Sequence, residues 1–223
     1  MASRPSTKAR LPLSLERVLR AAMHLADRDG IESLTMRKLA RELGVEAMTL
    51  YYYVAKKDDI LDGIADLVAS QIEVPSGGPD WKAASRQRAI SAHAVLVRHP
   101  WASMLWASRA ALGPERLRYM DAGLRGFREA GFSPQLTEHA YHAVENHIVG
   151  YTLQEMSFAI EAAEVAEGGA TSLRNLPADE YPDLAQHVMQ HLKGAGHVDA
   201  GDFEFALDLI LDGVERLRDT AGH

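Results

Sequence analysis

Residues 35–57 carry the side chains whose types and spacing are best suited to chemistry, and that chemistry is contact with DNA. Thr35 and Tyr51 have hydroxyl groups that suit phosphate oxygens, and Lys57 adds a positive charge near them. Arg37 has a forked guanidinium that matches O6 and N7 on the edge of guanine. The segment therefore offers contacts that fix position on the phosphate backbone and one contact that can read a base.

The spacing between residues 40 and 50 predicts the turn that positions these groups. Ala40 is small enough for two helices to cross closely, Gly44 supplies a positive φ four residues later, and Leu50 follows after six more. This pattern is typical of a helix-turn-helix, in which the second helix enters the major groove. Helical geometry turns Leu50 and Val54 inward, so the outward residues predicted to contact DNA are Ala47, Met48, Thr49, Tyr51 and Tyr52. Tyr53 either contacts DNA or fills the core, and a structural role for all three tyrosines is the alternative.

The flanking sequence completes a compact unit. Ser14 can cap a helix over residues 15–29, and Lys57 starts another helix that ends before Pro75-Ser76-Gly77-Gly78-Pro79. We therefore expect a helix-turn-helix domain of three or four helices in residues 1–75 and a linker in residues 76–80. Beyond the linker, proline and glycine punctuation predicts only helices, at roughly residues 81–98, 101–111, 115–130, 134–166, 181–193 and 202–219. The expected fold is all-α.

Charge is distributed unevenly along the chain. The 223 residues have a net charge of −7, yet residues 1–57 contain 11 Lys and Arg against 6 Asp and Glu, whereas residues 58–223 contain 13 against 25. The basic excess belongs to the predicted DNA-binding part, and the acidic remainder is expected to face away from phosphates. The chain has no cysteine, which excludes disulfides and thiolate chemistry. It has no 18-residue apolar run and no apolar signal segment, so we expect a cytoplasmic protein without a membrane partner.

The amino-terminal unit resembles the DNA-binding domain of the tetracycline-repressor (TetR) family of bacterial transcription regulators. The resemblance is carried by Ile31-Glu32-Ser33-Leu34-Thr35-Met36-Arg37-Lys38-Leu39-Ala40, Leu43-Gly44-Val45, Thr49-Leu50-Tyr51-Tyr52-Tyr53-Val54 and Lys57. The rest of the chain resembles the carboxy-terminal domain of the tetracycline-repressor branch, through His99-Pro100-Trp101, Gly131-Phe132-Ser133 and the long helix after Pro134. The resemblance implies a repressor of transcription that a small molecule releases from a palindromic, double-stranded DNA operator.

The resemblance also implies a ligand-binding and dimerisation domain in residues 81–223. Its pocket is expected to take a small apolar or aromatic ligand and to be lined by Trp101, Met104, Leu105, Trp106, Tyr119, Phe127, His139, His142, Asn146 and Val149. The last helix has a wide apolar face, which is often simply part of the core. In the family, however, the long helix and the last helix pair with their twins in the four-helix interface of a homodimer. The dimer interface is therefore predicted at Phe203, Leu207, Ile210 and Val214.

No cofactor and no metal are expected. His139 and His142 have the i, i+3 spacing of a metal-ligand pair, but such a pair arises easily by chance among 10 histidines. Near the family's metal-bound drug site this chain has Leu105, Asn146 and Gln154, which departs from the tetracycline-repressor pattern. The sequence has no nucleophile elbow and no phosphate loop, so an enzyme is not expected. Two alternatives stay open: a constitutive DNA-binding module without inducer, and a helical metal-dependent enzyme.

Overall fold

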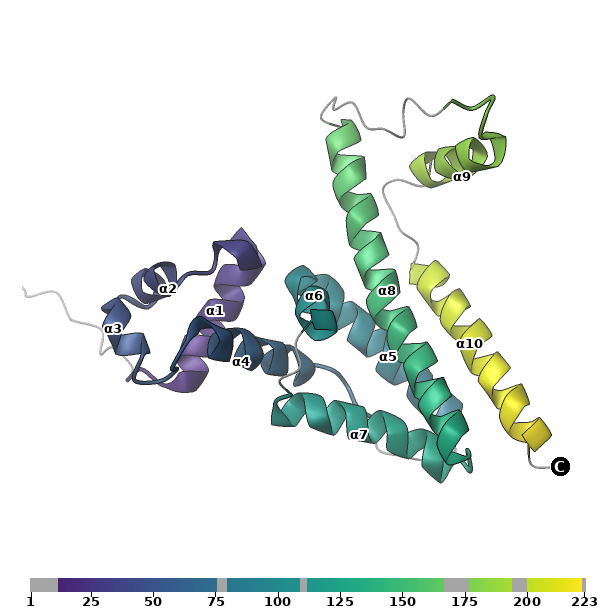
Figure 1. Ribbon diagram of the computed structural model, residues 1–223, viewed down its shortest axis with the longest axis horizontal. Coiled ribbons are helices and arrows are strands. Elements are labelled where there is room, and N and C mark those ends of the chain that lie inside the picture. The colour runs from purple at the N-terminus through teal and green to yellow at the C-terminus, as the bar shows by residue number, and fades with distance from the viewer. Residues whose placement is uncertain (1–11, 76–79, 109–111, 167–176, 194–199, 222–223) are drawn as a thin grey trace, which may run out of the picture.

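The computed structural model describes residues 12–75, 80–108, 112–166, 177–193 and 200–221, and all regular elements within these ranges are helices. Figure 1 shows a smaller body of helices, residues 15–69, joined to a larger body that begins at residue 81. The prediction of an all-α fold is confirmed. The basic amino-terminal arm and linker residues 76–79 lie outside the described residues, so the position of the linker stays a prediction.

The amino-terminal body consists of α1 (Leu15–Asp29), the 3₁₀-helix η1 (Ile31–Ser33), α2 (Met36–Leu43), α3 (Ala47–Leu50) and α4 (Lys57–Ala69). Side chains cap two of these helices: the Ser14 hydroxyl accepts from the Arg17 N–H, and the Thr35 hydroxyl accepts from the Lys38 N–H. Gly44 ends α2 in the left-handed conformation with φ 65°, which is the turn that the sequence predicts. The core includes side chains that are at most 1% exposed, among them Val18, Ala22, Leu39, Leu50, Ile60 and Ile64.

Two of these helices are shorter than the sequence suggests. α3 is a single turn, and the backbone N–H groups of Tyr51, Tyr52 and Tyr53 continue it with bonds to carbonyl oxygens three residues earlier. α4 ends at Ala69 rather than just before the linker, because the N–H groups of Gln71 and Ile72 bond to carbonyl oxygens three residues back. Ile72 nevertheless remains buried beyond the end of α4.

The carboxy-terminal body consists of α5 (Trp81–Arg98), α6 (Pro100–Ser108), α7 (Pro114–Glu129), α8 (Pro134–Ala166), α9 (Pro182–Lys193) and α10 (Ala200–Ala221). These bounds agree with the predicted ranges to within two residues, except that the predicted end of α6, residues 109–111, lies outside the described residues. α8 packs against α5, α6, α7 and α10, so it forms the centre of this body. Figure 1 shows α10 running beside α8, with α9 lying apart from the bundle.

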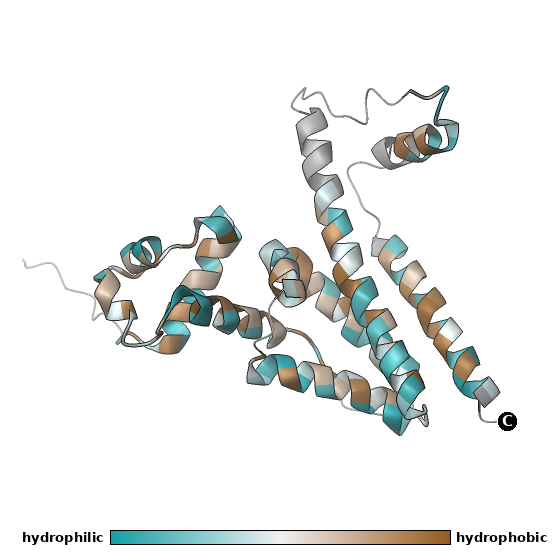
Figure 2. Cartoon of the chain, in the orientation of Figure 1, coloured by the Kyte–Doolittle hydropathy of each residue, from teal (hydrophilic) through white to brown (hydrophobic). Residues whose placement is uncertain are grey.

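α10 has two apolar stripes, and only one is buried in its own protomer. Phe203, Leu207 and Val214 are 1%, 0% and 7% exposed because they pack against α5 and α8. The predicted dimer interface is therefore corrected: these three side chains belong to the core of one chain, and Ile210 is half-buried. The exposed stripe, called here the second stripe, consists of residues four apart: Phe205, Leu209, Gly213 and Leu217. Its three large side chains are 57–66% exposed, and Figure 2 shows the apolar colouring along α10.

Ion pairs lie along the side of α10 that faces α5. Lys82 of α5 lies 2.6 Å from Asp212 and 2.6 Å from Glu215. Arg86, one turn further along α5, lies 2.8 Å from Asp208. These pairs hold α10 against α5 and leave the second stripe on the outside of the protomer.

Candidate DNA interface and ligand cavity

Large side chains of the helix-turn-helix point away from the core at the positions that the sequence predicts. Met48 is 71% exposed, Tyr52 is 87% exposed and Tyr51 is 47% exposed, whereas Leu50 is fully buried. The other predicted contact residues also reach the surface, with Thr35, Arg37 and Lys57 exposed and Ala47 and Thr49 half-buried. A methionine and two tyrosines exposed side by side form a patch that needs a partner, and DNA is the partner that the motif predicts.

Positive charge is available on the same surface. Arg28 is neutralised by Asp29 at 3.0 Å and by Glu42 at 3.2 Å. Arg37 and Lys57, in contrast, make no ion pair with any residue within the described ranges. Their charges are therefore free to pair with phosphate oxygens or with a base edge.

Tyr53 differs from the two tyrosines before it. It is half-buried, and its hydroxyl donates a hydrogen bond to the Leu13 carbonyl oxygen at 3.0 Å. This bond ties the recognition turn to the segment that precedes α1. The structure therefore favours the structural alternative for Tyr53, as a residue that positions Tyr51 and Tyr52.

Arg37→Ala should weaken operator binding by about 1–3 kcal/mol, because a bidentate contact to one guanine per half-site is lost. Sequence preference at that base pair should relax. Lys57→Ala is the matched comparison, since loss of a phosphate contact weakens all sequences alike and lowers the salt slope by about one unit. Anisotropy titrations of operator and scrambled duplexes at several salt concentrations measure both effects. Binding like the parent's by both variants would contradict the groove assignment.

Helix α4 connects the DNA surface with the second body. Its first residue, Lys57, belongs to the predicted DNA surface, and its last residue, Ala69, lines the cavity described below. Between them, the Asp66 carboxylate accepts a hydrogen bond from the Arg116 backbone N–H at 2.9 Å, at the start of α7. A Cβ atom at Gly113 would collide with this carboxylate, so the glycine permits the close approach. α4 is thus tied directly to a helix of the cavity wall.

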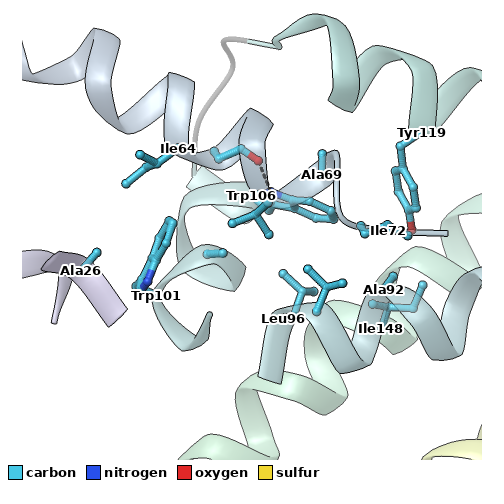
Figure 3. Packing of buried hydrophobic residues seen from close by; sticks show 14 of the residues in the cluster. Ala26, Ile64, Ala69, Ile72, Ala92, Leu96, Trp101, Trp106, Tyr119 and Ile148 are labelled. Carbon is cyan, nitrogen blue, oxygen red and sulfur yellow. Dashed lines mark hydrogen bonds between the residues drawn. The ribbon is translucent and has the colours of Figure 1, made fainter. Parts of the chain in front are cut away.

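Tryptophans pack against α4 from the side of α6. Figure 3 shows Trp106 lying at the end of α4 beside Ala69, with its indole N–H donating to the Ala65 carbonyl oxygen at 3.4 Å. The same view shows Trp101 on the side of Ile64. Both indoles are buried, 7% and 6% exposed. A displacement of α4 therefore requires these rings to repack.

A hydrogen-bonded cluster also joins the two bodies. One carboxylate oxygen of Asp27, on α1, accepts the Trp101 indole N–H at 2.7 Å and lies 2.8 Å from Nδ1 of His99. The other ring nitrogen of His99 lies 3.2 Å from Oε1 of Gln71, just beyond α4. His99 and Trp101 are both buried. The cluster therefore fixes α1 relative to α4 and α6.

Asp27→Ala should lower the free energy of unfolding by about 1–3 kcal/mol, because His99 and Trp101 lose their shared partner while remaining buried. Chemical denaturation measures the change. Glu32→Ala, which removes an exposed carboxylate from η1, is the control and should stay within about 0.5 kcal/mol of the parent. A loss for Asp27→Ala no larger than the control's would mean that the cluster does not hold the two bodies together.

A cavity of about 580 Å³ lies between the end of α4, α5 and α7. Its wall is mostly apolar or small, with Ala69, Ile72, Val74, Trp81, Ala84, Tyr119, Ala122, Gly123 and Gly126. Its charged residues are Arg88, Glu115, Arg118, Arg125 and Glu129. A mostly apolar cavity of this volume with a few polar groups is typical of a small-molecule site.

One of these charged side chains, Arg88, is buried, with 3% exposed. Its Nη1 donates to the Glu145 carboxylate at 2.7 Å, and the Tyr119 hydroxyl donates to the same carboxylate at 2.9 Å. Burial acts against the charge of Arg88, but the neighbouring Tyr119 and Glu145 outweigh it, so the pKa of Arg88 is raised. Burial and the charge of Glu145 raise the pKa of Tyr119, which keeps its hydroxyl protonated as a donor.

The second terminal nitrogen of Arg88, Nη2, is buried and has no hydrogen-bond partner among the described residues. The guanidinium is nevertheless held firmly, because it lies 4.8 Å from the centre of the Tyr119 ring and contacts Glu145. Buried polar groups without a partner are rare in native proteins. Arg88 therefore marks the polar end of the cavity.

Most of the predicted ligand residues lie outside this cavity, and Tyr119 is the one that lines it. The prediction that His139, His142 and Asn146 turn inward is wrong, since all three are exposed on the face of α8 opposite its buried face. The remaining residues are core or surface: Trp101, Trp106 and Phe127 are buried, Leu105 and Val149 are half-buried, and Met104 is 59% exposed.

The sequence analysis missed Arg88, although the sequence contains a signal for it. The buried face of α5 includes Trp81, Ser85 and Ala92, and Arg88 lies on that same face, three residues after Ser85 and four before Ala92. Arginine is seldom fully buried unless it is paired. An arginine at a core position of an amphipathic helix therefore indicates a buried partner or a ligand, and here Glu145 is the partner.

Within the described ranges, no helix combines the length and the apolar character that crossing a membrane requires. No three His, Asp or Glu side chains there lie close enough together to hold a metal ion.

The sequence matches two known families. Residues 18–64 match the family described as "Bacterial regulatory proteins, tetR family", and residues 74–218 match the "Tetracyclin repressor-like, C-terminal domain". The chain is 32% identical to the HTH-type transcriptional repressor DrrR1 of Streptomyces coeruleorubidus, over 96% of this chain and 82% of that repressor. It is 30% identical to the tetracycline repressor protein class C of Escherichia coli, over 93% of each chain.

Solved structures have the same fold. Apo ActR from Streptomyces coelicolor superposes with a TM-score of 0.76 at 26% identity, covering 96% of this chain and 100% of ActR. ActR in complex with (S)-DNPA superposes with a TM-score of 0.70 at 25% identity, covering 91% of this chain and 97% of ActR. ActR is thus known with and without a bound molecule.

Proposed function

The chain belongs to the tetR family of bacterial regulatory proteins and is a DNA-binding transcriptional regulator. We propose that it is a repressor and that a small molecule releases it from its operator. Relatives that are repressors support the proposal that this protein represses transcription rather than activates it. The complex of ActR with (S)-DNPA supports control by a small molecule. We assign DNA binding to residues 1–75 and ligand binding and dimerisation to residues 81–223, without a catalytic role.

The observation that carries this proposal is the position of α4. Lys57, at one end of the helix, belongs to the predicted DNA-binding surface of the protein, and Ala69, at the other end, lines the cavity. A ligand that fits the cavity best when α4 is displaced favours the conformer with displaced recognition turns. In that conformer the two turns of a dimer no longer match successive major grooves, so operator affinity falls. The cavity also argues against a module without an inducer.

The dimer follows from the second stripe of α10. Its exposed apolar side chains, Phe205, Leu209 and Leu217, recur at every fourth or eighth residue, and Gly213 between them allows close approach of another helix. Surface apolar groups in a continuous row require a cover. The second stripe of another copy of the chain has the matching length and chemistry to pack against it in a homodimer. The twofold axis of this dimer would place two recognition turns on the two halves of a palindromic operator.

A reporter assay tests the proposed function. A duplex selected by the protein from random DNA is placed between a promoter and a reporter gene, and reporter output is measured with and without the protein. The proposal expects output to fall when the protein is expressed and to recover when a cavity ligand is added. Reporter output that rises with the protein would show an activator and would contradict the proposal.

A further inference from the structure

We propose that the cavity binds a neutral, flat molecule through a carbonyl oxygen that accepts a hydrogen bond from Arg88. This inference rests on the proposed function in one respect, that the cavity is the regulatory site. It goes beyond that function because it names the chemical class of the ligand and the residue that selects it. Three features of the cavity support it: a free donor, a balanced charge and a wall that includes small residues.

The free donor is Nη2 of Arg88, which is buried and lacks a partner among the described residues. Tyr119 lies beneath the guanidinium, and Gly123 of α7 closes on it from another side. A Cβ atom at Gly123 would lie 3.0 Å from Cζ of Arg88 and 3.0 Å from Cε2 of Tyr141. Arg88 therefore cannot swing away without moving α7. Nη2 is closed off from solvent in this structure, so a ligand oxygen reaches it only when neighbouring side chains of the cavity wall shift. The new hydrogen bond then removes the penalty of an unsatisfied buried N–H group.

The charge of the cavity is balanced before any ligand enters. The wall contains three arginines and two glutamates, and Glu145 behind Arg88 contributes the third carboxylate. At the rim, Arg118 pairs with Glu115, and Arg125 lies 3.6 Å from Asp121. A ligand carboxylate bound to Arg88 would lie close to the Glu145 carboxylate, which already neutralises this guanidinium, and would be repelled by it. A neutral carbonyl oxygen accepts the same hydrogen bond without that repulsion.

Small residues of two helices form part of the cavity wall, and such a surface suits a flat molecule. These residues are Ala84 on α5 and Ala122, Gly123 and Gly126 on α7. A Cβ atom added at Gly126 would meet no atom within 4 Å, so the space beside this glycine is open. Aromatic side chains of Trp81 and Tyr119 complete the wall. A fused-ring molecule fills such a slot with many contacts and little loss of conformational freedom.

A matched trio of probes tests the proposal with the full-length protein. The probes are 9-fluorenone, which has the carbonyl; fluorene, which has the same rings without it; and fluorene-9-carboxylate, which carries a negative charge. Affinities are measured by quenching of tryptophan fluorescence, since Trp81 lines the cavity. Fluorenone should bind about tenfold more tightly than either of the others, as one hydrogen bond to a charged donor implies. The infrared carbonyl stretch of bound fluorenone should move to lower frequency.

One double variant and one matched pair of single variants locate the effect. The double variant Arg88→Met with Glu145→Gln removes both charges together and leaves the Tyr119 hydroxyl an acceptor, so the fold is retained. In this variant the carbonyl preference and the infrared shift should disappear. Gly126→Leu should weaken all three probes by about tenfold or more because the side chain fills the slot, whereas Gly126→Ala adds a single methyl group to open space and should bind nearly as the parent does.

Equal affinities for fluorenone and fluorene, tightest binding of the carboxylate, or no binding of any probe would each overturn the carbonyl assignment. Operator release is measured separately on the selected duplex. If fluorenone shows the expected preference but no compound releases the operator, the proposed function fails and the assignment of Arg88 stands. If another compound releases the operator and binds equally well to the double variant, the proposed function stands and this inference fails.

Discussion

Arg88→Met should lower the free energy of unfolding by about 3–5 kcal/mol, which is among the largest effects of any single substitution in this chain. The variant leaves the Glu145 carboxylate, 16% exposed, without the cation that lies 2.7 Å away. A partly buried charge that loses its partner is strongly destabilising, whereas replacing both members of a buried pair costs much less. The double variant with Glu145→Gln should therefore recover most of the lost stability. Urea denaturation of both variants measures the difference.

Arg118→Met is the control for this prediction. Arg118 lies at the rim of the same cavity and pairs with Glu115, but its side chain is 65% exposed. Exposed pairs contribute little, so this change should stay within about 1 kcal/mol of the parent. If Arg88→Met were no more destabilising than Arg118→Met, Arg88 and Glu145 would not form the structural pair on which the polar end of the cavity depends.

Leu209→Glu should convert dimers into monomers and reduce operator affinity by at least about a hundredfold, toward the level of non-specific binding. Leu209 is 58% exposed in the protomer, so the substitution leaves the fold intact and places an unpaired charge only in the dimer seam. A monomer contacts only one half-site, so the binding energy of the second half-site no longer contributes to operator affinity. Light scattering measures the assembly, and anisotropy measures the affinity.

Leu117→Glu is the matched control, because Leu117 is 51% exposed on α7 and lies outside the second stripe. It should leave both assembly and affinity unchanged. Leu207→Glu tests the correction to the interface, since Leu207 is fully buried in its own protomer and its substitution should unfold the chain. A dimer that survives Leu209→Glu would contradict the proposed seam.

The helix-turn-helix was predictable because its determinants are local. Ser14, Thr35 and Gly44 act within a few residues of their own positions, as caps or as a residue with positive φ. Exposure of Met48 and Tyr52 follows from helical spacing once the inward position of Leu50 is fixed. α3 is one turn shorter than expected, because the N–H groups after it bond to carbonyl oxygens three residues back instead of four.

The cavity and the inner face of α10 were not predictable in the same way. α8 has polar groups such as His142 on one face and Val144 on another, and which face turns inward depends on how α5 and α7 pack against it. α10 has one apolar row that includes Leu207 and another that includes Leu209. Sequence spacing alone does not show which row is buried in the protomer. Packing of Phe203 and Leu207 against α5 and α8 decides between them, and these contacts join residues far apart in the sequence.

Selection of binding sites from random duplex DNA tests the central claim most directly. The purified parent protein should enrich an inverted repeat whose half-site centres lie one helical turn, about 10–10.5 base pairs, or a multiple of it apart. Arg37→Ala should enrich the same repeat with one position in each half relaxed. Enrichment of no sequence, or of a single half-site without symmetry, would contradict the account of a twofold regulator that reads DNA through residues 35–57.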